Sequence, residues 1–363
     1  MNKKTKFLHT PPGSKPFYKE EAILRNSIEK TLSNFFEKWG FFPIETPIID
    51  YFDVYSPIFS DELRKNTIKF VDKDGEVILL RNDITLFAAK LIASRIADNN
   101  DMLKYYYSDA VMRYEKSDSL HEYYQIGCEI VGDNFTYQEI EVLSILLESL
   151  PLLEINDYIL HIGDVSFYQN LLESLPKENL YKILDAIRLR DKRTLLRLLD
   201  ENNLSEDIKN DCLLASTFIG SLSELENLGF SQKTKPFLDN LINIGKILYS
   251  LGYKEQITFD LSELSKLNYY YNGIIFHLYS KGVETPLVSG GRYDLLFREL
   301  GIKKCAVGFS FWLYPLEKLL TGKDFSSKED VENILIEKSP EQSFKDAIKK
   351  VRENKKIDLI YGK

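Results

Sequence analysis

The sequence is poor in the residues that build metal centres and disulfide frameworks. Its 363 residues include 3 cysteines and 4 histidines. Cys128, Cys212 and Cys305 lie far apart without a CxxC pair, and the histidines show no metal-ligand spacing. We therefore predict neither a structural metal ion nor a disulfide, and no motif points to a bound cofactor.

Long apolar runs and an excess of positive charge are also missing. No run approaches the roughly 20 apolar residues that a membrane span requires. The basic residues 1–6 are soon followed by Pro11-Pro12-Gly13 rather than by the apolar core of a secretory signal. The formal net charge of -8 argues against a broad nucleic-acid surface. We expect a cytoplasmic protein without membrane contact.

What is present is the apolar patterning of a large α+β fold. Helical spacing predicts helices over residues 20–39, 84–97 and 138–150, and Gly40 ends the first of them. Alternation and turn-rich loops predict extended segments at residues 41–50, 68–71, 77–80, 105–115, 123–131, 269–279, 285–289 and 305–312.

The middle of the chain changes character. Residues 165–255 carry leucines at helical spacing without alternation, which predicts an all-helical insertion between core residues 1–164 and 256–320. Residues 321–363 are predicted to form a short strand-helix-strand tail, with its helix near residues 344–352.

Two predicted strands place polar groups on one face. Alternate residues of a strand share a face, so Gln125, Gly127 and Glu129 point away from their apolar neighbours. A solvent-exposed face is an equally good interpretation of this strand alone, because antiparallel sheets often wet one side. Tyr271 and Gly273 share a face of the other strand, however. Aromatic hydroxyls and a glycine next to a carboxylate favour a ligand-binding floor.

Other polar residues carry weaker signals. An isolated strand arginine such as Arg113 is more often part of a surface ion pair than a phosphate ligand. His121 and His277 are not expected to do chemistry, because neither has a nucleophile or an acidic partner at a telling spacing. No Gly-rich phosphate loop of the GxxxxGK[ST] kind occurs.

The order of the motifs resembles the class II aminoacyl-tRNA synthetase core, and within it the histidyl branch, over roughly residues 10–320. Residues 41–50 resemble the first class II motif, which forms a dimer. Leu80-Arg81-Asn82-Asp83-Ile84-Thr85 resembles the segment whose acid and threonine hold the amino group of histidine. The resemblance therefore assigns Asp83 and Thr85 to histidine binding and implies a mainly antiparallel sheet flanked by helices.

The remaining motifs complete this resemblance. Residues 112–115 and 125–129 resemble the second class II motif, which implies phosphate or other anion binding by Arg113 and amino-acid binding by Gln125 and Glu129. Residues 270–273 resemble the family's Tyr-Tyr-Thr-Gly element, followed by its Gly-Gly-Arg-Tyr-Asp partner at 290–294. The histidine-binding residues implied are thus Asp83, Thr85, Gln125, Glu129, Tyr270 and Tyr271.

The catalytic parts of the family pattern are altered. Lys266 stands where the family has an arginine, and a lysine lacks the planar fork that grips carboxylate or phosphate. The loop over residues 116–122 contains no arginine. In the third motif Trp312 replaces a small glycine and Pro315 replaces a phosphate-clamping arginine. These changes oppose ATP binding through added volume and lost charge, so we expect no catalytic residue.

A retained histidine pocket without nucleotide contacts resembles the regulatory-subunit family of the short-form ATP phosphoribosyltransferase. Only residues 321–363 follow Leu320, fewer than the roughly 100 residues of a separate anticodon-binding domain. The resemblance implies a non-catalytic chain with three features: a short catalytic partner chain, histidine as inhibitory effector, and self-association as a dimer or higher within a hetero-octamer. It implies no tRNA partner.

Two other functions remain open. The chain could be a divergent but active histidyl-tRNA synthetase, since most of the family pattern is retained. It could also be a synthetase-like adaptor without histidine affinity, because Asn82 replaces the usual proline and Asn272 the usual threonine of the pocket motifs. Isothermal titration with histidine separates the adaptor from the other two.

The altered catalytic motifs predict that the isolated chain forms no histidyl-adenylate. Lys266, Pro315 and the arginine-free loop remove charge stabilisation at the transferring phosphate. The measurement is histidine-dependent exchange of labelled pyrophosphate into ATP, with an active histidyl-tRNA synthetase as the positive control. We expect no exchange above background; a histidine-dependent signal would identify an active synthetase.

Overall fold

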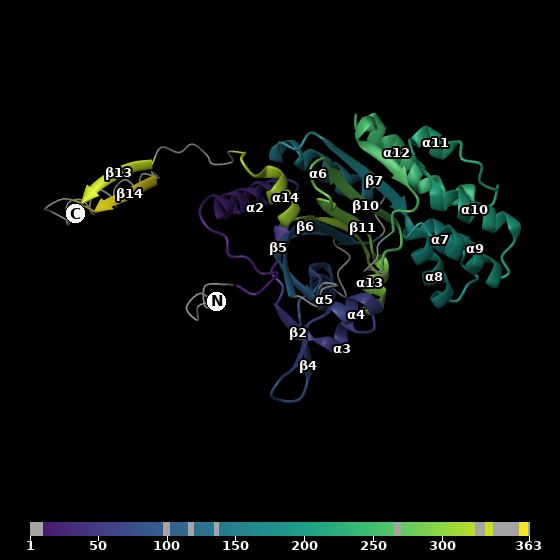
Figure 1. Ribbon diagram of the computed structural model, residues 1–363, viewed down its shortest axis with the longest axis horizontal. Coiled ribbons are helices and arrows are strands. Elements are labelled where there is room, and N and C mark those ends of the chain that lie inside the picture. The colour runs from purple at the N-terminus through teal and green to yellow at the C-terminus, as the bar shows by residue number, and fades with distance from the viewer. Residues whose placement is uncertain are drawn as a thin grey trace, which may run out of the picture.

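The computed structural model of the chain describes residues 10–96, 102–114, 120–133, 138–264, 270–323, 331–336 and 356–361 (Figure 1). No helix within these stretches is both long and apolar enough to cross a membrane. Lys266, most of the predicted 116–122 loop and the predicted tail helix lie outside the described residues.

A nine-stranded sheet forms the centre of the fold. Its strands, in spatial order, are β1 (Phe42–Pro43), β5 (Leu103–Tyr114), β6 (Leu120–Gly132), β12 (Cys305–Trp312), β11 (Val288–Arg292), β10 (Ile274–Ser280), β7 (Tyr158–Asp164), β9 (Ile257–Asp260) and β8 (Ile219–Gly220). Neighbours from β5 to β7 are antiparallel, whereas β1 pairs with β5 and β9 with β7 in parallel. The expected mainly antiparallel sheet flanked by helices is confirmed.

The two faces of this sheet differ as the alternation in β6 predicted. Ile126, Cys128 and Ile130 are fully buried in the larger apolar core. The helices that contribute to this core on the same side are α2 (Glu20–Lys38), α6 (Gln138–Ser149) and α14 (Leu313–Leu320). The alternate residues of β6 therefore face the other side of the sheet, where the polar site lies.

Helix α2 shows how local sequence produces this layer. Ile28, Leu32 and Phe36 recur every fourth residue, and all are fully buried. Spacing of this kind forms one apolar stripe, so the helix lies with that stripe on the sheet. The helix ends at Lys38, and Gly40 adopts a positive φ of 81° that other residues rarely reach. The predicted helix is confirmed.

A smaller three-stranded sheet carries the second apolar core. Its order is β2 (Ile49–Tyr51), β4 (Val77–Leu80) and β3 (Lys69–Val71). The helices next to it are α3 (Phe52–Tyr55), α4 (Asp61–Asn66) and α5 (Ile84–Ile96). The β3–β4 hairpin and the start of α5 confirm the predictions for this region, and α5 begins directly after Asp83.

The prediction of one interrupted strand over residues 41–50 was wrong in detail. The segment forms β1 and β2, which belong to different sheets. Pro43 and Pro47 lack a backbone N–H, so the segment cannot donate a continuous ladder of hydrogen bonds. The chain therefore leaves the central sheet after Ile44 donates its N–H to the Tyr106 carbonyl.

The insertion is mostly, but not entirely, helical. Its helices are α7 (Val165–Leu171), α8 (Lys177–Arg188), α9 (Lys192–Glu201), α10 (Glu206–Thr217), α11 (Leu222–Glu226) and α12 (Asp239–Ser250). Asp191, Ser205 and Ser221 cap α9, α10 and α11 by accepting backbone N–H groups. The all-helical prediction missed β8, which pairs with β9, because two residues are too few to show alternation. The division into core, insertion and tail stays a prediction.

Several strand boundaries also differ from prediction. β7 and β9, the strands on either side of the insertion, were not predicted. The last three residues of β7 are all buried, so burial does not follow simple alternation along this strand. β10 begins at Ile274 rather than near residue 269, and β11 runs later than predicted, through the two glycines at 290 and 291. In the tail, β13 (Val331–Ile336) and β14 (Lys356–Tyr361) pair in parallel. They correspond to the two strands of the predicted strand-helix-strand tail.

One face of the small sheet is unusually apolar. The strand register places Ile49, Tyr51 and Phe70 on this face, and all three side chains are exposed. Ile48, next to them in the link between β1 and β2, is exposed as well. A contiguous exposed apolar surface commonly marks an interface between proteins. We propose that two copies of the chain pair through this surface about a two-fold axis.

The proposed pairing predicts a dimer that charge can disrupt. Replacing Ile48 and Tyr51 together by glutamate should give monomers, because pairing would then bury unpaired carboxylates. Both side chains are about half exposed in the single chain, so the fold should tolerate the change. Sedimentation velocity at micromolar concentration is the measurement. Leu189→Glu, at an exposed site in the insertion, is the control and should stay dimeric. A monomeric wild type, or a dimeric double variant, would refute the pairing.

Candidate functional site

A cavity of about 360 Å³ opens beside the polar face of the central sheet. Every residue that the sequence predicted for histidine or anion binding lines it, namely Asp83, Thr85, Arg113, Gln125, Glu129, Tyr270 and Tyr271. They come from the start of α5, from β5 and β6, and from the segment before β10. The structure thus brings all the predicted residues together around one cavity.

Glu129 lies at the centre of one end of the cavity. Strand register places it between Tyr105 of β5 and Gly308 of β12. A Cβ atom at Gly308 would overlap the Glu129 carboxylate and the Cys128 carbonyl. Glycine at 308 therefore leaves the space in which the buried carboxylate turns toward the cavity.

Three hydroxyl groups hold this carboxylate. Thr85 and Tyr107 donate to Oε1 at 3.1 and 3.2 Å, and Tyr293 donates to Oε2 at 2.7 Å. Burial raises the pKa of Glu129 from 4.5 to about 8; the hydroxyl donors oppose this rise, and the nearby Asp83 adds to it. The carboxyl group is consequently held in place but poorly compensated by positive charge.

Asp83 is a second buried acid in the same cavity. Its Oδ1 accepts the Leu86 backbone N–H at 3.1 Å in the first turn of α5, and its Oδ2 accepts the Tyr270 hydroxyl at 3.2 Å. An Arg113 Nη2 atom lies 3.9 Å from Oδ2. Burial raises the pKa of Asp83, and Arg113 only partly offsets the effect.

Arg113 and Trp312 form the neighbouring wall. The Arg113 Nε donates to the Asn82 carbonyl at 2.5 Å, and its guanidinium carbon lies 5.8 Å from the Trp312 ring centroid. The Trp312 Nε1 donates to the Ser289 hydroxyl at 3.2 Å. Arg113 is thus already engaged by protein groups, and the indole takes up space beside it. Pro315 is buried on α14 and does not line the cavity.

Sequence reasoning missed some functional side chains. Tyr107 and Tyr293 donate to Glu129, and the Ser310 hydroxyl accepts a hydrogen bond from the Nε2 of the predicted Gln125 at 3.1 Å. Tyr293 stood within the recognised Gly-Gly-Arg-Tyr-Asp element and could have been chosen from it. Tyr107 lies opposite Gly127 across the β5–β6 ladder, and that register was not predictable from periodicity alone.

The far end of the cavity holds a different set of groups, including Arg188, Glu263, His277 and Tyr279. The expectation that His277 has no acidic partner was wrong, because its Nδ1 lies 3.1 Å from Glu263 Oε1. His161, Asp260 and Glu263 also place ligand atoms within 4.8 Å of one another, so they could hold a metal ion. The sequence spacing did not predict this group, because His161 lies in β7 and is separated by about 100 residues from Asp260, at the end of β9, and Glu263, just after it.

The chain resembles two groups of known proteins. A family model of histidyl-tRNA synthetase matches residues 13–316. The ATP phosphoribosyltransferase regulatory subunit of Ruminiclostridium cellulolyticum is 29% identical over 312 residues, covering 84% of this chain and 74% of that protein. The subunit of the same name from Acetivibrio thermocellus is 28% identical with the same coverage. The resemblance to these regulatory subunits is confirmed.

Solved structures support the fold. An ATP phosphoribosyltransferase regulatory subunit/histidyl-tRNA synthetase from Bacillus halodurans C superposes with a TM-score of 0.83 at 24% identity, covering 97% of this chain and 92% of that one. Histidyl-tRNA synthetase from Nostoc sp. PCC 7120 gives 0.74 at 19% identity, covering 98% and 86%. With the family model spanning most of its length, the chain belongs to the histidyl-tRNA synthetase family.

Proposed function

We propose that this chain is a non-catalytic regulatory subunit of an ATP phosphoribosyltransferase. In this role it activates a short catalytic chain and transmits feedback inhibition by histidine in the first step of histidine biosynthesis. The observation that carries the proposal is the buried pair Asp83 and Glu129, lined by tyrosines, in a chain whose matched relatives are named regulatory subunits.

The chemistry of the pocket suits histidine. A zwitterion with an imidazole offers an ammonium group and a ring N–H as donors, and buried carboxylates are strong acceptors for both. We place the ligand between Gln125, Glu129 and the rings of Tyr270 and Tyr271, with its amino group near Asp83 and Thr85. The raised pKa values of both acids favour a cationic partner, because such a partner would supply the compensating charge that the pocket lacks.

The other wall of the pocket argues against adenylate chemistry. ATP would need several cationic groups around its phosphates. Arg113 already donates to Asn82 and lies near Asp83, and Trp312 stands beside it. A divergent but active histidyl-tRNA synthetase is therefore the second candidate function, after the regulatory subunit. It is favoured by the family match alone.

The assembly follows from the regulatory role. We propose that dimers of this chain combine with short catalytic chains in a hetero-octamer in the cytoplasm, with no tRNA, cofactor or membrane needed. A ligand can shift such an assembly only through different affinities for its active and inhibited states. Histidine binding must then be tighter in the inhibited state of the complex.

Substituting Glu129 tests the sensor. Glu129→Gln keeps the volume but removes the charged acceptor, so one ligand donor loses its partner at roughly 1–3 kcal/mol, or about tenfold to a hundredfold in affinity. The histidine concentration for half-inhibition of the reconstituted complex should rise by that factor, measured against each complex's own uninhibited rate. Calorimetric titration of the isolated chain with histidine should show the same loss.

A matched control separates this effect from general damage. Glu255→Gln changes an exposed glutamate outside the cavity and should leave inhibition at the wild-type concentration. If Glu129→Gln also inhibits like the wild type, the pocket is not the sensor. Failure of the chain to bind or activate any short catalytic chain would instead refute the regulatory role itself.

The ligand-free stability of the same variant tests the electrostatics of the pocket. The pKa of Glu129 is raised from 4.5 to about 8 on folding. The unfolded chain therefore loses this proton first as the pH rises. Stability falls between these two values and levels off above them. Glu129→Gln cannot ionise at this position, so it should not show this loss. The melting temperature of the variant minus that of the wild type should therefore increase as the pH rises from 4.5 to about 8. A difference that stays constant with pH would contradict the assignment.

A further inference from the structure

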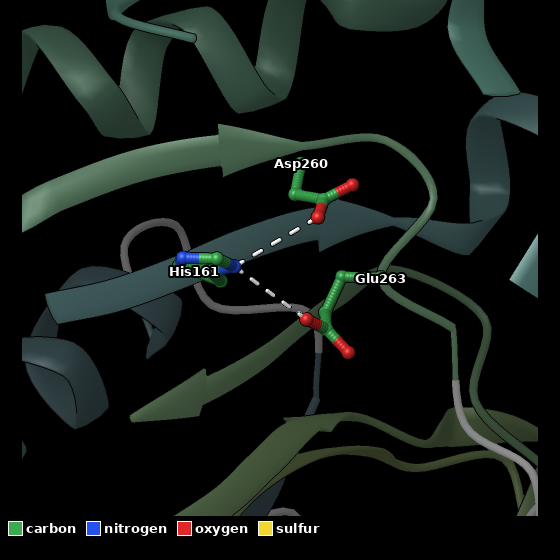
Figure 2. Close-up of side chains that lie close together, drawn as sticks. All are labelled: His161, Asp260 and Glu263. Carbon is green, nitrogen blue, oxygen red and sulfur yellow. Dashed lines mark ion pairs between the residues drawn. The ribbon is translucent and has the colours of Figure 1, made fainter. Parts of the chain in front are cut away.

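Two histidines from neighbouring strands converge on Glu263, a carboxylate that lines the same cavity but takes no part in the proposed histidine contacts. His161 of β7 and His277 of β10 are directly opposite each other in the antiparallel ladder. Asp260 ends β9, the parallel neighbour of β7, and Glu263 follows three residues later. Figure 2 shows His161 between Asp260 and Glu263, with its ring directed toward both carboxylates.

The distances within this cluster are those of ligands around a common point. His161 Nδ1 lies 3.8 Å from Asp260 Oδ2 and 3.7 Å from Glu263 Oε2. On the other side, His277 Nδ1 lies 3.1 Å from Glu263 Oε1. Ligands of a tetrahedral metal ion with bonds of about 2.1 Å are about 3.4 Å apart. Small side-chain rotations would therefore bring these atoms to coordination distance.

Two histidines and one arginine lie next to the two carboxylates of the cluster. Asp260 is 2% exposed and accepts Arg190 Nη2 at 2.8 Å, and the Arg190 side chain is half exposed. Among the described residues, Glu263 has no lysine or arginine partner in an ion pair. The His277 Nδ1 atom is buried and makes no hydrogen bond, despite its closeness to Glu263. A buried ring nitrogen that faces a carboxylate at 3.1 Å without a well-formed hydrogen bond can take a metal ion as its partner.

We propose that His161, Asp260 and Glu263 bind a divalent transition-metal ion, for which Zn²⁺ is the best match, with His277 as the adjoining ligand or the partner of Glu263. Imidazole and carboxylate groups are preferred zinc ligands, and a site of this mixed kind tolerates a water as a further ligand. Two carboxylates beside one half-exposed arginine carry negative charge that a divalent ion can neutralise.

An ordinary ion-pair network is the competing explanation. Asp260 first, and then Glu263, raise the pKa of His161 to about 9, so a proton on His161 can take the place of the metal. Metal binding would have to displace this proton, and metal affinity should therefore increase with pH. The two explanations differ in whether the cluster takes up an ion at all.

An ion bound by this cluster would link several parts of the fold around the cavity. Glu263 and His277 also line the far end of the cavity, while Arg190 follows α8 in the insertion. A bound ion would connect the sheet, the segment directly after β9 and the cavity wall. The proposal does not depend on the regulatory function, because it rests only on the ligand geometry.

Cobalt and zinc titrations of the full-length, chelator-treated chain test the site. At about pH 8, where protons compete less, we expect one Co²⁺ per chain, with visible absorption of a low-symmetry nitrogen and oxygen site. Zn²⁺ should displace it. X-ray absorption of the zinc form should show nitrogen and oxygen ligands without sulfur.

Variants locate the bound ion. His161→Gln and Glu263→Gln should each weaken Zn²⁺ binding by roughly 100-fold, whereas the matched controls His121→Gln and Glu255→Gln should bind like the wild type. Absence of stoichiometric binding by the wild type would overturn the proposal, as would a sulfur ligand in its spectrum. The wild-type spectra decide the question even if a cluster variant does not fold.

Discussion

The burial of Glu129 is the constraint on which the pocket depends. A carboxylate at this depth must be given space and donors, or it could not be tolerated. Gly308 supplies the space across the β6–β12 ladder, and the donors Thr85, Tyr107 and Tyr293 come from three further elements. These side chains meet only when α5, β5, β12 and Tyr293, the residue directly after β11, are all in place. The site can therefore form only when the strands of the sheet are correctly paired.

The polar groups of the pocket suit the binding of a small ligand better than a chemical reaction. Its two buried acids are held by hydroxyl groups and are short of positive charge, which suits a small ligand with several N–H donors. Beside them, Arg113 is engaged by the protein and Trp312 fills space that a nucleotide would need. The proposed regulatory role requires an amino-acid pocket but no phosphate contacts, and so it is compatible with the match to the histidyl-tRNA synthetase family.

Sequence alone predicted the parts of this site that are encoded locally. Alternation in β6 placed Gln125 and Glu129 on one face, and family motifs identified Asp83, Thr85 and the tyrosine pair. The parts that depend on long-range register were missed. Tyr107 joins Glu129 only through the β5–β6 ladder, and His161 meets His277 only through the β7–β10 ladder. The two-residue strand β8 and the division of residues 41–50 between sheets have the same origin, since tertiary pairing decides them.

The central claim is that histidine is recognised by this chain itself. Calorimetric titration of the isolated wild-type protein with L-histidine tests it most directly, with 1-methyl- and 3-methyl-histidine as probes of the ring N–H groups. The account predicts one histidine per chain and weaker binding of at least one methylated analogue, because a buried acceptor would lose its donor. No measurable binding to the isolated chain, with a reconstituted complex that histidine still inhibits, would contradict it.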